Sequence, residues 1–155
     1  MKIIISPYSS KLKNGLQNPK NYPYFNEVIK ELKKEGIYTI QIGVDGEEKF
    51  KEANEYQFNL NLKDLERLTL SVDTFISVDN FYPHLCNLIN KKGIVIFSQS
   101  DPLIFGHSLH INLLKDRSYL RENQFWLWEQ CSYNYEAFIN PIIVKKAIES
   151  ILKNE

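Results

Sequence analysis

The sequence of 155 residues lacks several features that identify common classes of protein. It holds only two cysteines, Cys86 and Cys131, and they lack Cys-x-x-Cys spacing. Two cysteines without that spacing form neither a zinc site nor a disulfide framework. No apolar run is long enough to span a membrane, and the short run in MKIIISPYSS is not a signal peptide. We therefore expect a cytoplasmic protein with reduced thiols and no membrane span.

An excess of charge of either sign is also missing. Lys and Arg together count 19, Asp and Glu together count 19, and the formal net charge is zero. Domains that bind the phosphate backbone of nucleic acids usually carry a basic excess, so we expect no nucleic-acid partner. A small anion stays compatible with this balance, because one helix N-terminus and one lysine can hold a phosphate.

The familiar glycine-rich and nucleophile motifs are absent as well. The chain has no Gly-x-Gly-x-x-Gly after its first apolar run and no Gly-x-x-x-x-Gly-Lys-Ser/Thr. This argues against a dinucleotide-dependent dehydrogenase and a P-loop nucleotide hydrolase. No nucleophile elbow of the type found in serine hydrolases occurs either.

What the sequence does contain is an alternation of short apolar runs and amphipathic stretches. Strands are expected at 2–6, 37–42, 56–60, 74–78, 93–97 and 108–113, and helices at 23–34, 47–54, 62–72, 83–89 and 144–152. Residues 115–140 look irregular. The continuous apolar strands are typical of a sheet that is covered on both faces. The pattern predicts an α/β fold: one Rossmann-like domain over residues 1–155, with a mostly parallel sheet of about six strands and helices on both faces.

In an open α/β sheet, ligands bind outside the carboxyl ends of the strands, at the point where the strand order reverses. The residues that follow the expected strands are therefore the ones to inspect. They are mostly small, polar or acidic, and comprise Tyr8-Ser9-Ser10, Gly43 to Gly46, Asp79-Asn80 and Ser98 to Pro102.

Three segments, taken in order, resemble the C-terminal, nucleotide-sugar-binding domain of GT-B glycosyltransferases, and most closely the heptosyltransferases of glycosyltransferase family 9. The first, SPYSSKLKNGLQNPKNYPYFNEVIKEL, resembles the family's strand, hydroxyl-bearing loop and Lys-x-aromatic-Pro helix start. The second, LNLKDLERLTLSVDTFISVDNFYPHLCNLINKKGIVIFSQSDP, resembles its Asp-Ser/Thr-Gly-x-x-His-Leu helix and Ser/Thr-Asp-Pro loop. The third is the ending, with Trp128, Cys131, Pro141 and Val144.

The resemblance implies roles for particular residues. The donor's phosphates would meet loop hydroxyls, a lysine and the helix that follows the fourth strand, while the turn after the second strand would lie near the nucleoside. The implied donor- and phosphate-binding residues are Ser9, Ser10, Lys20, Asp79, Asn80 and His84; the nucleoside side is Gly43 and Glu47; a further loop contact is Ser100 and Asp101. The resemblance implies neither a metal nor a cofactor, and it identifies no catalytic base.

The chain departs from the family pattern in two ways. Phe81 stands where the family has Gly, and a phenyl ring either blocks or redirects the approach of a phosphate to the backbone. Asn80 replaces a Ser or Thr, although Asn also caps helices. The acceptor-binding N-terminal half of such enzymes has no counterpart, and because Met1 directly precedes the first strand we expect this absence to be native.

Several alternatives remain open at the level of sequence. The resemblance implies the donor-binding half of a glycosyltransferase, which uses a nucleotide diphosphate sugar together with an acceptor-domain subunit or as a homo-oligomer. A non-catalytic protein that sequesters or senses a nucleotide sugar is the alternative, and a degenerate interaction module is a third. Each residue also has a structural interpretation: Asp79 as a helix cap, His84 as a core histidine, Lys20 as a solvated loop residue, Ser9, Ser10 and Asp101 as turn residues, and Phe125, Trp126 and Trp128 as packing.

Overall fold

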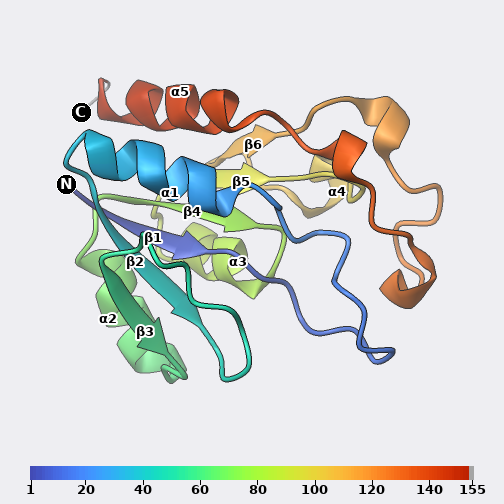
Figure 1. Ribbon diagram of the computed structural model, residues 1–155, viewed down its shortest axis with the longest axis horizontal. Helices are drawn as coiled ribbons and strands as arrows, with labels where there is room; N and C mark the ends of the chain where they lie inside the picture. The colour runs from blue at the N-terminus through green and yellow to red at the C-terminus, as the bar shows by residue number, and fades with distance from the viewer. Residues whose placement is uncertain (154–155) are drawn as a thin grey trace.

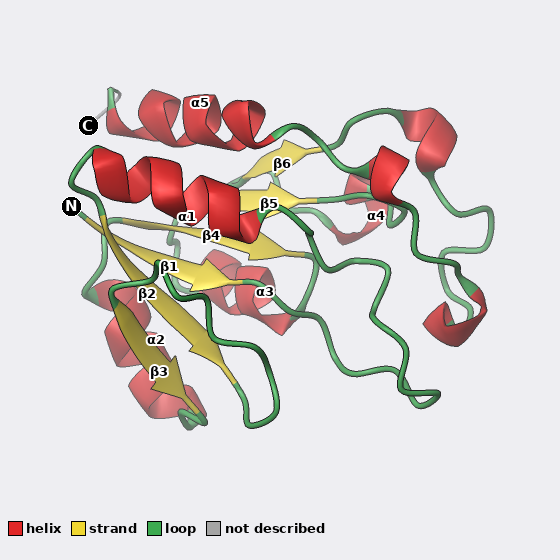
Figure 2. Ribbon diagram, viewed as in Figure 1, coloured by secondary structure: helices red, strands yellow, loops and turns green. Residues whose placement is uncertain are grey.

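The computed structural model describes residues 1–153, which form an α/β fold around one six-stranded sheet (Figures 1 and 2). The strand order is β3-β2-β1-β4-β5-β6, and every pair of neighbouring strands is parallel. The strands are β1 (Lys2–Ser6), β2 (Tyr38–Gly43), β3 (Glu55–Phe58), β4 (Thr74–Val78), β5 (Ile94–Ile96) and β6 (Ile111–Leu113). The expected Rossmann-like class is confirmed, and the order reverses between β1 and β4.

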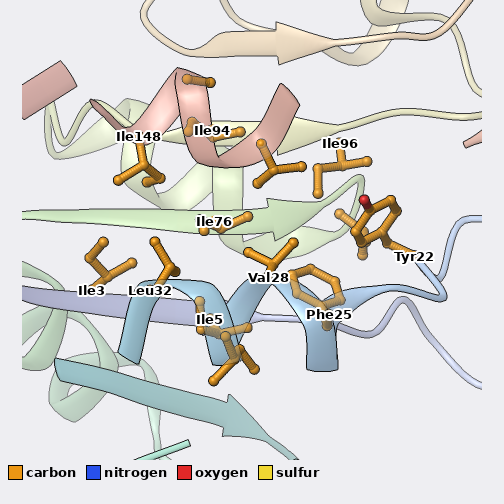
Figure 3. Close-up of a cluster of buried hydrophobic side chains, with 14 of the residues drawn as sticks. Ile3, Ile5, Tyr22, Phe25, Val28, Leu32, Ile76, Ile94, Ile96 and Ile148 are labelled. Atoms are coloured by element: carbon orange, nitrogen blue, oxygen red, sulfur yellow. The ribbon is translucent and has the colours of Figure 1, made fainter. Parts of the chain in front are cut away.

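Helices cover both faces of the sheet, as the unbroken apolar strands predicted (Figure 1). One face carries α1 (Phe25–Lys34) and α5 (Pro141–Leu152), and the other carries α2 (Leu62–Leu70) and α3 (Phe81–Leu88). Side chains alternate along β1, so Ile3 and Ile5 join the α1/α5 core while Ile4 joins the α2/α3 core. Figure 3 shows the α1/α5 core, where residues of both helices pack onto the central strands.

The helix α1 illustrates how the sequence dictates an element. Its apolar stripe, Phe25, Val28, Ile29 and Leu32, is buried against the sheet. Gly36 follows with φ +73°, the left-handed conformation that ends many helices and that glycine adopts without strain. The expected start at Pro23 is two residues early, since the helix begins at Phe25.

Other expected helices also differ from those in the structure: α2 ends at Leu70 rather than at 72, and α5 begins at Pro141 rather than at 144. Two further differences have a cause in particular side chains. Residues 47–54 form no helix, because the buried Gln41 side chain donates to the Glu48 carbonyl and accepts from the Phe50 amide, which holds this segment as a loop. The helix α3 begins at Phe81 rather than at Pro83, because the Asn80 side chain accepts from the Tyr82 amide and caps the helix two residues earlier. Proline is tolerated there, since first-turn amides have no partner within the helix.

The remaining segments connect elements at the carboxyl edge of the sheet. The loop 98–106 contains a short helix, α4 (Pro102–Phe105). The irregular stretch 115–140 holds three single 3-10 turns: η1 (Arg117–Tyr119), η2 (Trp128–Gln130) and η3 (Tyr135–Ala137). Figure 2 shows these long loops gathered at the end of the sheet opposite the N-terminus. Within residues 1–153, no helix is long and apolar enough to cross a membrane.

Candidate functional site

The reversal of strand order creates a crevice where the chain leaves β1 and β4 in different directions. Ser9 follows β1, and its side chain donates a hydrogen bond of 2.6 Å to the Asp79 carbonyl after β4. The Ser9 amide in turn donates to the Asn21 side chain at 2.8 Å. Three segments that are distant in sequence are therefore fastened together at the switch point, and this is where open α/β sheets hold ligands.

Lys20 reaches into this crevice and pairs with Asp79. The Lys20 Nζ lies 2.9 Å from the Asp79 Oδ2, as an ion pair outside hydrogen-bond geometry, and the two side chains are 17% and 6% exposed. The ammonium also lies over the Trp128 ring, 4.7 Å from its centroid, and 5.6 Å from that of Phe105. A cation so placed is attracted to the faces of both rings. Asp79, Trp128 and Phe105 thus form a cage around the Lys20 ammonium, which is not that of a solvated loop lysine.

The loop that delivers Lys20 is held by the buried Asn18. The Asn18 side chain donates to the Ser10 carbonyl at 2.9 Å and accepts from the Lys20 amide at 3.0 Å. Sequence reasoning missed Asn18, as well as Phe105 and Trp128 as neighbours of Lys20. The sequence marks Trp128 as part of an aromatic cluster and of the third resembling segment, and no local signal places it over a lysine more than 100 positions away.

Asn80 serves the architecture of the crevice. Its side-chain amide donates to the Ser6 hydroxyl at 2.9 Å and to the Tyr8 carbonyl at 3.0 Å, while its oxygen accepts from the Tyr82 amide at 2.8 Å. One residue therefore caps α3 and ties it to the end of β1. Because the Tyr82 amide is taken and Pro83 has none, the α3 start offers a ligand few free donors, chiefly the Phe81 amide.

Two adjoining pockets open at this edge of the sheet. The first, of 960 Å³, lies among the loops that follow β1, β2 and β3 and the start of α3. The second, of 420 Å³, contains Lys20 and Asp79 under the 125–128 segment. Both are lined by the same connecting residues: Ser9, Ser10, Lys11, Asn18 and Asn80.

The two pockets differ in charge. Acidic residues dominate the first pocket, with Asp45, Glu47 and Glu48 against Lys11. Lysines dominate the second, with Lys11, Lys13 and Lys20 against Asp79 and Glu129. An elongated ligand with a neutral, hydroxyl-bearing end and an anionic middle would match the two pockets. Its neutral end would lie in the acidic first pocket, and its anionic part would lie near the lysines of the second.

The expected nucleoside-side residues both line the first pocket. The Glu47 carboxylate folds back and accepts from the Val44 amide at 3.0 Å, and burial raises its pKa. Gly43 makes room for this, because a Cβ there would lie 2.4 Å from the Glu47 Oε2. The nearby Tyr8 has its pKa raised to about 12 by burial and by Glu48 and Glu47, so its hydroxyl stays protonated.

Ser100 and Asp101, expected as a loop contact, line neither pocket. The Asp101 carboxylate accepts two hydrogen bonds from the Arg117 guanidinium, at 3.0 and 2.8 Å, and another from the Leu103 amide. These bonds hold the pKa of Asp101 below its usual value, with the Arg117 contact the main cause. Asp101 caps α4, while the Ser100 hydroxyl is buried and has no hydrogen-bond partner within residues 1–153.

His84 is also placed away from both pockets. Its Nδ1 lies 2.7 Å from the His107 Nε2, and the His107 ring meets that of His110 edge to face. The buried His110 lies 2.9 Å from the Pro83 carbonyl through its Nε2. The chain's three histidines thus connect the loop before β6 to the first turn of α3.

Because of this histidine cluster, we expect the free energy of unfolding to fall in mild acid. Burial lowers the pKa of His107 and of His110, and neighbouring histidines add to the effect. Because the folded pKa values lie below the unfolded value of about 6.5, both groups favour the folded state above that pH, and this contribution is lost as the pH falls through the folded values. We expect the urea midpoint to drop between about pH 7 and pH 5. In His107→Gln the drop should be smaller, and an equal drop in both proteins would contradict the assignment.

No zinc-like or carboxylate cluster accompanies these residues. Within residues 1–153, no group of three or more His, Cys, Asp or Glu is arranged to hold a metal ion. The Cys86 thiol is buried, and burial raises its pKa to about 12, so it is no nucleophile at neutral pH.

Comparisons with known proteins give two different results. No family model matches the sequence. Two curated relatives, the methylenetetrahydrofolate–tRNA-(uracil-5-)-methyltransferases TrmFO 2 of Mycoplasma capricolum and TrmFO 1 of Mycoplasma mycoides, are each 32% identical over 107 residues. Each match covers 61% of this chain but 24% of the relative, so the chain spans about a quarter of the length of these enzymes.

The solved structures that resemble this chain are glycosyltransferases. The glycosyl transferase family 9 protein of Veillonella parvula superposes with a TM-score of 0.77 at 17% identity, over 100% of this chain and 46% of its own. The E. coli heptosyltransferase WaaC with ADP gives 0.68 at 16% identity, over 97% and 44%. The dodecameric iron-containing heptosyltransferase TibC of E. coli with ADP-D-beta-D-heptose gives 0.71 at 16% identity, over 99% and 45%.

The likeness to these structures extends over nearly the whole chain, whereas the sequence matches cover 61% of it. Each of the three glycosyltransferases is more than twice as long as the part that this chain matches. The resemblance expected from the ordered motifs is confirmed as a likeness of fold: the chain shares the fold of just under half of a family 9 glycosyltransferase.

Proposed function

We propose that this chain is the donor-binding half of a glycosyltransferase with GT-B architecture, and that it binds a nucleotide diphosphate sugar across its two pockets. The observation that carries the proposal is the pair of adjoining pockets of opposite charge at the β1–β4 switch point. The structural neighbours that hold ADP or ADP-D-beta-D-heptose support it, since their fold is the same.

In this proposal the nucleoside occupies the first pocket and the diphosphate the second. The Ser9 and Ser10 loop and Lys20 would contact the phosphates, and Glu47 would accept from the nucleoside's hydroxyls or amines. When the bond between the sugar and the diphosphate breaks, negative charge grows on the leaving diphosphate. A lysine preorganised in a largely buried cage stabilises that charge more than it stabilises the bound donor, and this lowers the barrier.

Transfer also needs a base to activate the acceptor, and we assign no such base in this chain. We therefore propose that a separate acceptor-binding protein, or a second copy of this chain, completes the enzyme, and that transfer uses no metal or further cofactor. The chain's two free cysteines agree with a reducing, cytoplasmic setting for this assembly. The balanced charge of 19 basic and 19 acidic residues argues against a tRNA substrate of the kind that the names of the two methyltransferases indicate.

A non-catalytic binding protein is the second candidate. It would sequester or sense the nucleotide sugar, with the 125–128 segment covering the second pocket.

A thermal-shift screen with nucleoside diphosphates and nucleotide sugars tests the proposal. A ligand at 100 times its Kd stabilises the folded state by about 2.7 kcal/mol, and we expect such a shift with at least one nucleoside diphosphate. The absence of any shift, confirmed by calorimetry, would reject both candidates. If the protein binds a donor, release of the nucleoside diphosphate by the protein alone would reject the non-catalytic candidate.

A further inference from the structure

Phe81 stands at the start of α3, and the lining of the two pockets shows which of them its side chain borders. The side chain is 61% exposed at the first residue of α3. It lines the first pocket and is absent from the lining of the second, which contains Lys20 and Asp79. The ring therefore leaves the proposed diphosphate site open and forms a wall of the neighbouring pocket.

Other exposed apolar side chains line the same pocket. Leu16, Val44 and Leu62 are 65%, 55% and 58% exposed, and each comes from a different loop or helix. Large apolar side chains that converge in one concave, largely apolar site are typical of a small-molecule pocket rather than of ordinary surface. Their exposure leaves apolar area that a ligand would cover.

The charge of the first pocket restricts what could cover these side chains. Asp45, Glu47 and Glu48 outnumber Lys11, so a phosphate or carboxylate is disfavoured there. The ligand portion that fits is uncharged, with an apolar face toward the ring of Phe81 and hydrogen-bond donors toward the acids. A nucleobase has a flat π-face and polar edges, and it meets both requirements.

We propose that Phe81 is a stacking platform for the nucleobase of the bound ligand and so a determinant of its affinity. This rests on the proposed donor-binding function and deepens it. Stacking of a base on an aromatic side chain tolerates any base, because each has a π-face. Phe81 would therefore strengthen the binding of nucleotides in general, and Glu47 and its acidic neighbours would distinguish between them through the base edges.

The test measures Kd by calorimetry for ADP, GDP and UDP with wild type, Phe81→Ala, Phe81→Leu and Phe81→Trp. The matched control is Leu88→Ala, on the same helix, where the side chain is 82% exposed and lines neither pocket. For the diphosphates that wild type binds, we expect Phe81→Ala and Phe81→Leu to weaken binding by about tenfold, because one base–aromatic stack is lost. Phe81→Trp should retain the affinity, and Leu88→Ala should not change it. Circular dichroism checks that each variant is folded.

Two results would overturn the inference, and they differ in what they say of the proposed function. Unchanged or tighter binding by Phe81→Ala or Phe81→Leu, with wild type binding normally, rejects the platform while the donor-binding function stands. If the wild-type protein binds none of the three diphosphates, the donor-binding function is rejected, and so is the role of Phe81 as a stacking platform.

Discussion

Replacing Lys20 with Met should weaken nucleoside diphosphate binding by about 100-fold and lower the free energy of unfolding by about 3 kcal/mol. The first effect follows from the loss of the largely buried cation in the proposed phosphate site. The second follows because the buried Asp79, whose side chain is 6% exposed, would lose its ion-pair partner. Uncompensated buried charge is among the costliest defects that a single substitution can introduce.

A second substitution separates the two effects. Adding Asp79→Asn to the Lys20→Met protein removes the unpaired charge, so most of the lost stability should return while ligand binding stays weak. The matched control is Lys33→Met, which breaks an exposed ion pair with Glu52 and should change stability by less than about 1 kcal/mol. Urea denaturation and calorimetry on the four proteins provide the measurements. Normal affinity in folded Lys20→Met would remove Lys20 from the site.

Replacing Asn80 with Ala should lower the free energy of unfolding by about 3 kcal/mol, from a lost helix cap and two further side-chain hydrogen bonds of about 1 kcal/mol each. Three of the partners left behind are the Tyr82 amide, the Ser6 hydroxyl and the Tyr8 carbonyl, which lie on both sides of the switch point. The Ser77 hydroxyl also donates to the Asn80 oxygen, but it keeps its hydrogen bond to the Val78 carbonyl. Because these bonds hold β1 and α3 in register, nucleotide affinity should fall as well.

Asn61→Ala is the control for the cap alone. Asn61 caps α2 by accepting from the Asp64 amide in the same way, but it is exposed and bonds only within its own helix turn. Its replacement should cost about 1 kcal/mol and leave ligand binding unchanged. Equal losses for the two substitutions, measured by urea denaturation, would show that Asn80 serves only as a cap.

Most of the helices and strands could be predicted from the local pattern of apolar residues in the sequence. The β-branched runs such as Ile3 to Ile5 are apolar at every position, and only a strand covered on both faces buries them all. The apolar stripe of α1 determines which face of the helix packs against the sheet; it comprises Phe25, Val28, Ile29 and Leu32. The errors lie where hydrogen bonds from a side chain to nearby backbone groups override propensity, as those of Gln41 do for the segment 47–54.

The candidate site was predictable in part. Residues directly after parallel strands must meet at one edge of the sheet, so Ser9, Gly43 and Asp79 could be grouped from sequence alone. The contact of His84 with His107 could not be predicted in this way, because His107 is 23 residues away and on no regular element. Asp101 likewise follows a strand, yet its carboxylate is engaged by Arg117.

The sequence by itself determined the class of fold, the positions of the strands and the set of polar residues at their carboxyl ends, because these depend on contacts between near neighbours and on a repeating pattern. The tertiary structure alone decided the Lys20–Asp79 pair beneath Trp128, the separation of two pockets of opposite charge, and the direction of the Phe81 ring. These features depend on how loops from opposite ends of the chain pack together, and no periodicity in the sequence encodes such long-range packing.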